Sequence, residues 1–362
     1  MIGAGAIGLG TAWHLAQQGH DVSVYDPRLN QSVDREGSAN DLSGTSASLG
    51  VLMGHVFRRS SGRGWRLRRR SMELWPQWIE TLQAHQPDLK LHPGLLQIAE
   101  DERAAERMES LAAERVDLGL HMVSNADLAA VWPTASHGGL YSRHDGRVDP
   151  LLLQLALRQA LAEQSVALNA TAVVRLERID NHWYVYRADG DSSVHNLVIL
   201  STALCSDALL KPLGHARAMT AVLGQALSLQ LTTGPTAWSN WPSVLVDQGF
   251  NLIPTAPGRL LLGATVEPGN RASEDPLTLM RSLNERAPEW LSSAMVVGHW
   301  SGLRARPVDR PAPLLEELEP GLILASGHYR NGVLLTPGTA EWVAAAVQQL
   351  SLIHISEPTR PY

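Results

Sequence analysis

The feature that most constrains the fold is a glycine-rich stretch at the start of the chain, Gly3-Ala4-Gly5-Ala6-Ile7-Gly8. In this G-x-G-x-x-G pattern the first glycine allows a tight strand-to-helix turn. The second lets the backbone approach a pyrophosphate, and the third lets the helix pack against the strand. A helical pattern over 9–18 ends at Gly19, and a strand over 22–25 leads to Asp26, where a carboxylate can bind a ribose hydroxyl. The order of these elements predicts an adenine dinucleotide site; a tight turn that binds no phosphate is the alternative.

The sequence is unusual at both ends of the chain. Only Met1 and Ile2 precede the glycines, so we expect a chain clipped by a few residues within the strand that would be central in a parallel sheet. Residues 350–362 break the helical pattern before them and look like a translated sequencing adapter. We expect them to be a non-native tail, with a genuine disordered tail as the alternative.

Length and composition set the class of protein. A chain of 362 residues exceeds what one hydrophobic core usually serves, so two domains are expected. The net charge of −6 argues against nucleic acid or an anionic membrane as the main partner. The single cysteine, Cys205, excludes a disulfide framework and a cysteine metal site, and we expect no metal. No apolar stretch reaches transmembrane length and no signal peptide is recognisable, so a cytoplasmic enzyme is expected.

Two further segments stand out in the first quarter of the chain. Residues 45–54 are small, hydroxyl-rich and glycine-rich, which would let backbone N–H groups reach a large flat ligand; a tight packing turn is an equal alternative. Seven arginines follow between Arg58 and Arg70. Because aromatic residues hardly interleave with them and the whole chain is acidic, a solvated loop and helix face is favoured over a nucleic-acid site. An amphipathic helix is predicted over 71–82.

The rest of the chain suggests a discontinuous nucleotide domain. Residues near 85–147 read as an insertion that covers something, and a hairpin-like passage lies over 138–149. Strand, helix and strand patterns then return up to residue 200. Later elements are a hairpin over 250–264, a strand over 296–303 that leads into Arg304, and a polar loop over 327–333 before a final helix over 339–349.

Four motifs together carry a resemblance to a known family. They are the glycine loop, residues 198–206, Gly302-Leu303-Arg304, and Gly327-His328-Tyr329-Arg330-Asn331-Gly332-Val333-Leu334-Leu335. The set resembles the FAD-dependent D-amino-acid oxidase superfamily, specifically its glycine oxidase branch, over nearly all of residues 1–349. The stretch Arg310-Pro311-Ala312-Pro313 is similar to one in the cyanobacterial members.

The resemblance implies an α/β fold with a Rossmann-like FAD-binding domain and a second, smaller α+β substrate domain built on an antiparallel sheet. The FAD-binding domain is expected to comprise residues 1–84, 148–215 and 300–349. The substrate domain would then comprise residues 85–147 and 216–299.

The resemblance also implies roles for particular residues. The glycine loop would hold the pyrophosphate, Asp26 the adenosine ribose and Val173 the adenine, while segment 45–52 would line the flavin and loop 328–334 would cap its pyrimidine end. The predicted cofactor-binding residues are Gly3, Gly5, Ala6, Ile7, Gly8, Asp26, Thr45, Ser46, Ala47, Gly50, Val51, Leu52, Val173, His328, Arg330, Asn331, Gly332, Val333 and Leu334.

Arg304 and Arg330 are the predicted catalytic residues. Arg304 would bind the substrate carboxylate, for which a planar guanidinium is a natural bidentate partner, and Arg330 would lie beside it. The alternatives are a structural ion pair of Arg304 with Glu267 or Asp309, and His328 as a packed loop histidine.

The implied reaction is oxidative deamination of glycine or another small amino acid or amine, with hydride transfer to non-covalent FAD and reoxidation by O2 to H2O2. Competing interpretations are a related dehydrogenase with another electron acceptor, a flavoprotein that modifies a tRNA-linked amine, and a non-catalytic member. A homo-oligomer is possible.

Three positions depart from the family pattern. Ala203 stands where glycine is usual, and Asn251 stands where glycine oxidase has a substrate-facing tyrosine, which puts glycine itself in doubt as substrate. Cys205 is not at the place where sarcosine-oxidase relatives tether FAD, so FAD is expected to be non-covalent.

Overall fold

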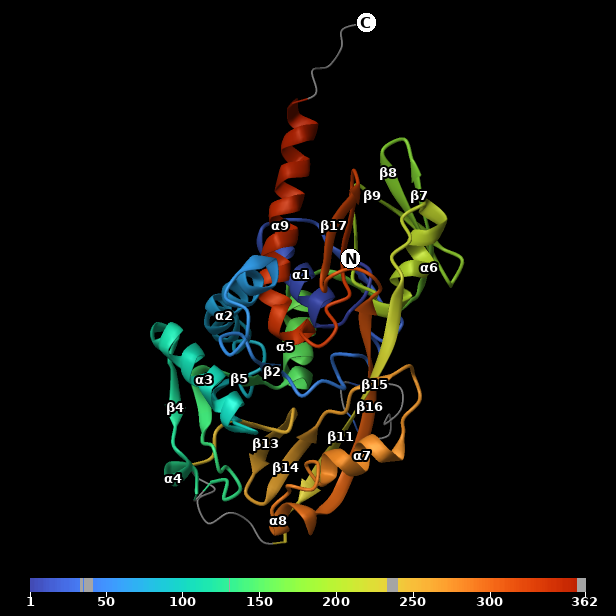
Figure 1. The fold of residues 1–362 in the computed structure, drawn as a ribbon. Coiled ribbons are helices and arrows are strands. Elements are labelled where there is room, and N and C mark those ends of the chain that lie inside the picture. Colours follow the sequence, from blue (N-terminus) through green and yellow to red (C-terminus); the bar gives the residue numbers. More distant parts are fainter. Residues whose placement is uncertain (33–34, 36–41, 130, 233–239, 357–362) are drawn as a thin grey trace, which may run out of the picture.

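The computed structural model describes residues 1–32, 35, 42–129, 131–232 and 240–356. Its strands fall into a short parallel sheet, a large and mostly antiparallel sheet, and a small three-stranded sheet, with helices packed around them (Figure 1). This arrangement confirms the predicted α/β class.

The parallel sheet is organised around Ile2, which forms parallel bridges to both Tyr25 and Leu200. Two parallel strand pairs flank Ile2: β1 (Ser23–Tyr25) with β6 (Ala167–Asn169), and β10 (Val198–Leu200) with β18 (Leu322–Ser326). The strand β17 (Leu314–Glu319) adds an antiparallel edge to β18. Ile2 therefore occupies the central position that the sequence predicts for the strand before the glycines.

Both faces of this sheet are buried, as its apolar strands require. Ile199 and Ile323 pack on one face against α1 (Ala6–Gln17), α5 (Pro150–Glu163) and α9 (Gly332–Ser356). Leu200 and Leu324 pack on the other face against the sheet of β7 (Val173–Ile179), β8 (His182–Arg187) and β9 (Ser192–His195). The helix α2 (Gly62–Leu82) packs beside α9 through Trp75 and Trp78.

The large sheet lies in the lower part of Figure 1 and has ten strands. In order they are β15 (Glu267–Pro268), β11 (Met219–Gln230), β14 (Arg259–Gly263), β13 (Phe250–Ala256), β12 (Val244–Asp247), β3 (Leu91–Ile98), β5 (Gly139–Val148) and β2 (Val51–Leu52), with β16 (Met295–Pro307) on β11 and β4 (Leu120–Val123) on β5. Pairing is antiparallel except between β12 and β3.

The two faces of the large sheet have different neighbours. One face, with Ala226 and Trp300, packs against Leu49 and so faces the segment after the glycine loop. The opposite face packs against α7 (Glu274–Arg281) and α8 (Glu289–Ser292) through residues such as Leu227 and Leu262. The remaining helices are α3 (Glu102–Glu114), α4 (Asn125–Leu128) and α6 (Ser206–Leu210).

Several predicted elements need correction. The hairpin over 138–149 is wrong, because β5 is one continuous strand. The helix α2 begins at Gly62 rather than residue 71, and α9 begins at Gly332 rather than Thr339 and continues to Ser356, into the segment expected to be a tail. Residues 357–362 of that segment lie outside the described residues.

The predicted domain boundary at residue 300 falls inside β16, so Arg304 is carried by the large sheet. The domain limits otherwise stay a prediction. Within the described part of the chain, each helix is too short or too polar to cross a membrane.

Candidate functional site

The glycine loop and Asp26 lie together at the carboxyl edge of the parallel sheet, where ligands of open α/β folds bind. They follow the neighbouring strands at Ile2 and β1, and the Ala4 N–H donates to Asp26 Oδ2 at 2.8 Å. The loop 327–331 follows β18 at the same edge. Val173 begins β7 only four residues after the end of β6, which also ends at this edge.

The glycine loop has the geometry of a phosphate site. Gly3 has a φ of +103°, and a Cβ at Gly8 would lie 1.8 Å from Gly3 O, so neither position accepts a side chain. Gly5 caps α1 without a side-chain hydrogen bond, and the first turn of α1 contains no acidic residue. No carboxylate of its own therefore competes at this helix N-terminus with a phosphate, and the loop fits the pyrophosphate of FAD.

The segment 43–52 lies between the glycine loop and the large sheet. Ala6 N–H donates to Thr45 Oγ1 at 2.9 Å, and Trp300 Nε1 donates to Ala47 O at 3.0 Å. A Cβ at Gly302 would lie 2.2 Å from Ala47 Cβ, so β16 approaches the segment closely only because residue 302 is a glycine. The segment continues into β2, so Thr45, Ser46, Ala47, Gly50, Val51 and Leu52 join the predicted pyrophosphate site to the sheet that carries Arg304.

The side chain of Arg304 is held at one edge by the backbone. Its Nη1 donates to Leu223 O and to Thr265 O, each at 3.0 Å. Burial, followed by the positive charge of Arg330, lowers the pKa of Arg304 to about 10, so it stays protonated at neutral pH. Within the described residues, neither Nη2 nor Nε of Arg304 forms a hydrogen bond, which leaves the other edge of the guanidinium for a ligand.

The predicted alternative, an ion pair of Arg304 with Glu267 or Asp309, is not formed among the described residues. Glu267 is 4% exposed, and its carboxylate accepts hydrogen bonds from Gln225 Nε2 at 2.9 Å, from Ser273 N–H at 2.8 Å and from Thr265 Oγ1. Because Thr265 O accepts from Arg304, Glu267 supports the guanidinium indirectly. Arg304 thus has the charge to bind an anion and no described carboxylate as a salt-bridge partner.

The helix α2 holds both the loop before α9 and the first turn of α9. Arg68 Nη1 donates to Asn331 Oδ1 at 3.0 Å, and Trp75 Nε1 donates to Leu334 O at 3.0 Å. His328 is buried and its Nε2 lies 3.0 Å from Thr339 Oγ1. Burial, followed by the charge of Arg63, lowers the pKa of His328 to about 3, so the ring is neutral.

Sequence reasoning missed the role of Arg68. It assigned the arginine run to a solvated face, which holds for Arg69 and Arg70, because both are exposed and donate to Glu73 and Glu341. Arg68 instead stacks on Phe57, with its Cζ 4.1 Å from the ring centroid. The signal was present, because Arg68 lies two helical turns before Trp75 and therefore on the same face of α2.

Arg330 is exposed in the loop, close enough to Arg304 for its charge to depress the pKa of that guanidinium. The remaining predicted cofactor-binding residues of this segment, Gly332, Val333 and Leu334, form the first turn of α9.

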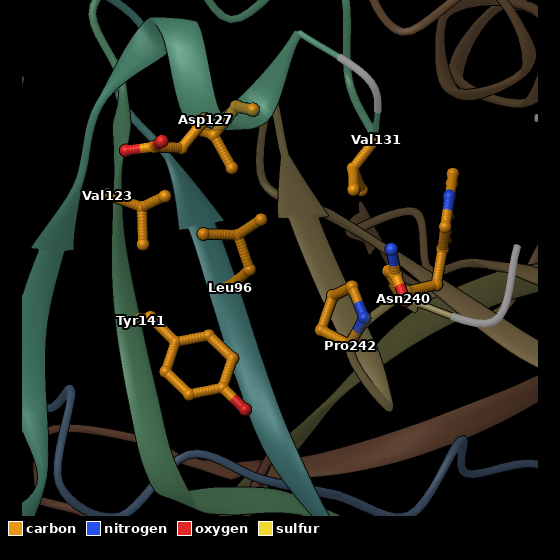
Figure 2. Close-up of a pocket in the computed structure, with 9 residues that line it drawn as sticks. Leu96, Val123, Asp127, Val131, Tyr141, Asn240 and Pro242 are labelled. Carbon is orange, nitrogen blue, oxygen red and sulfur yellow. The ribbon is translucent and has the colours of Figure 1, made fainter. Parts of the chain in front are cut away.

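A cavity of about 300 Å³ lies elsewhere, on the other face of the large sheet. Figure 2 shows Leu96, Val123 and Tyr141 on neighbouring strands, with Asn240 and Pro242 across from them. Leu96 packs with Leu227, on the face turned away from Ala226 and Trp300. None of the predicted site residues lines this cavity, so it is separate from the candidate site.

The structure thus combines a glycine loop at the edge of a parallel sheet with a second sheet that presents an arginine. This combination is typical of an enzyme that uses a dinucleotide cofactor. The chain belongs to the FAD dependent oxidoreductase family, which matches residues 1–346. FAD is therefore its cofactor, and the resemblance seen in the sequence is confirmed.

Individual relatives agree with this assignment. The glycine oxidase of Bacillus licheniformis is 27% identical over 361 residues, which cover 95% of this chain and 91% of that protein. The crystal structure of glycine oxidase from Geobacillus kaustophilus has a TM-score of 0.80 at 23% identity, covering 96% of this chain and 93% of that one. The L-proline dehydrogenase from P. horikoshii also has a TM-score of 0.80, at 17% identity, covering 96% of this chain and 92% of that one.

Proposed function

We propose that this chain oxidises a small amino acid or amine that carries one carboxylate, at an FAD bound between segment 45–52 and the face of β11 and β16. The observation that carries the proposal is the guanidinium of Arg304. It is held at one edge by Leu223 O and Thr265 O, it is protonated, and it has no described carboxylate as a salt-bridge partner.

The chain's own residues bind and orient the substrate. The free edge of Arg304 donates two hydrogen bonds to the carboxylate, and the nearby charge of Arg330 adds attraction for an anion. Fixing the carboxylate fixes the Cα–H direction, so orientation supplies a large part of the catalysis. Bound FAD would supply the redox chemistry, accepting a hydride equivalent from Cα–H and passing two electrons to O2; the amine would lose two electrons and two protons to become an imine that water hydrolyses, and O2 would become H2O2.

The relatives favour an amino acid as the substrate class, because several are glycine oxidases. Glycine itself is not favoured over other small amines. Asn251 stands on β13 where the glycine oxidase branch has a tyrosine, and its Nδ2 donates to Gly263 O at 3.0 Å. The side chain at position 251 is thus shorter than a tyrosine and is hydrogen-bonded to the neighbouring strand.

Oxygen is the proposed electron acceptor, and a dehydrogenase that uses another acceptor is the second candidate, because an oxidase and a dehydrogenase both share this fold at a TM-score of 0.80. The FAD is proposed to be non-covalent and the enzyme cytoplasmic.

The test is to load the purified chain with FAD and to mix it anaerobically with glycine, sarcosine or D-alanine. We expect at least one of them to bleach the visible flavin band, and air to restore the band with release of peroxide. A flavin that binds but is bleached by none of these amines would contradict the proposal. Bleaching that is reversed by a quinone but not by air would assign a dehydrogenase instead.

A further inference from the structure

The sheet face that carries Arg304 contains glycines where strands usually carry side chains. Gly224 of β11 pairs with Gly302 of β16, and Val222 pairs with Arg304. Because alternate residues of a strand point to the same face, Gly224, Gly302 and Arg304 share one face. Gly224 lies outside the positive-φ region, so its backbone conformation does not require glycine.

What requires glycine at position 224 is the side chain of Arg304. A Cβ there would lie 2.2 Å from Nη2, 2.4 Å from Nη1 and 2.5 Å from Cζ. The guanidinium therefore lies directly against the Cα of Gly224, in space that any other residue would fill. Since these atoms form the end of a flexible side chain, an alanine would displace the guanidinium rather than the strand.

We propose that Gly224 is a positioning residue for the substrate carboxylate, acting through Arg304. Its missing side chain lets the guanidinium lie flat on β11 with Nη1 between Leu223 O and Thr265 O. Displacing the group would break both hydrogen bonds and turn its free edge away from the bound carboxylate. This inference rests on the proposed role of Arg304 in carboxylate binding.

The test compares Gly224→Ala with Gly298→Ala in the FAD-loaded full chain. Gly298 lies on β16 on the same face, and its nearest contact for a new Cβ is Ser228 Cβ at 3.2 Å, so it is a matched control away from Arg304. The readouts are bound FAD, the Kd for acetate by calorimetry, and the KM for the best amine substrate. We expect Gly224→Ala to keep its FAD and to raise both constants at least about tenfold, the equivalent of one lost charged hydrogen bond. Gly298→Ala should change neither.

A double-mutant cycle with Arg304→Ala separates positioning from a general structural effect. If Gly224 acts only through the guanidinium, Gly224→Ala should change the acetate Kd by less than about twofold in the Arg304→Ala background. Should Gly224→Ala alone fail to fold, the double variant should fold, because the colliding group is gone; a double variant that also fails would overturn the inference.

The two proposals fail in different ways. A wild-type acetate Kd in Gly224→Ala, or equal effects of that substitution in both backgrounds, would overturn the positioning role while leaving Arg304 as the carboxylate ligand. A wild-type acetate Kd in Arg304→Ala would overturn the proposed function itself, and the positioning role with it.

Discussion

The most informative substitution is Arg304→Ala, whose effect follows from the hydrogen bonds of the guanidinium. Nη1 is already bonded to two backbone carbonyls, so Nη2 and Nε are the donors left for a carboxylate. A hydrogen bond to a charged group contributes about 1.5–3 kcal/mol. Arg304 is only half-buried, so the lower value applies to each of the two bonds. Their loss costs about 3 kcal/mol, which is roughly a 100-fold rise in KM or more.

The assay is steady-state peroxide release over a range of amine concentrations, with FAD content measured on the same samples. Arg306→Ala is the matched control, because Arg306 lies two residues further along the same face of β16 but is exposed. We expect Arg306→Ala to keep the wild-type KM within about threefold, the scale of one surface charge interaction. If Arg304→Ala kept a near wild-type KM, or if both variants lost affinity equally, the reasoning would be refuted.

Three further predictions concern the cofactor and the stability of the fold. Asp26→Ala should weaken FAD binding about 10- to 100-fold in a fluorescence titration, because one or two charged hydrogen bonds to the ribose are lost. Asp26→Glu should recover part of the affinity for FAD. An unchanged affinity in Asp26→Ala would show that Asp26 does not bind the cofactor. The pKa of His328 falls from 6.5 to about 3 on folding, so below pH 6.5 the unfolded chain binds more protons, and the free energy of unfolding should decline toward pH 3. His328 should add up to about 1.4 kcal/mol per pH unit to this slope, so in urea titrations the slope should be smaller by about that amount in His328→Asn; an unchanged slope in that variant would rule out the contribution of His328. Ala203 has a φ of +49°, in the region that favours glycine, so Ala203→Gly should stabilise the protein by roughly 0.5–1 kcal/mol, and a loss of stability would contradict this.

The parts of the fold that the sequence predicts best are those whose signals are local. The glycine loop, the helix after it and Asp26 form one continuous strand-helix-strand unit. Each of these elements is predicted from its own residues, without knowledge of distant contacts. The central position of Ile2 follows from the same unit, because the strand that enters such a loop lies between its parallel neighbours.

Two of the wrong element boundaries lie next to glycines that the structure places inside regular elements. A Cβ at Gly146 would lie 2.0 Å from His92 O, so this glycine lets β3 and β5 approach within the sheet rather than ending a strand. Pro337-Gly338 lies inside α9, where the Gly338 N–H donates to Ser71 Oγ at 3.2 Å. The missing side chain of Gly338 lets α2 pack closely against α9.

The sequence alone could not predict which residues hold the guanidinium of Arg304, for a different reason. Gly224 and Arg304 are 80 positions apart, and their contact exists only in the register that pairs Val222 with Arg304. Likewise, the hydrogen bond of Arg68 to Asn331 joins segments that only the packing of α2 on α9 brings together. A motif can predict that an arginine binds a ligand, but the residues that hold it come from strand pairing and helix packing.

The central claim is that FAD lies between the glycine loop and the face of the large sheet that carries Arg304. The most direct measurement is a crystal structure of the FAD-loaded chain with acetate. The account predicts pyrophosphate oxygens within hydrogen-bond distance of the N–H groups of Gly5, Ile7 or Gly8, since those of Ala4 and Ala6 already donate to Asp26 and Thr45. It also predicts acetate paired with the free edge of Arg304 against the flavin. A dinucleotide bound away from the glycine loop, or an Arg304 that does not contact acetate, would contradict it.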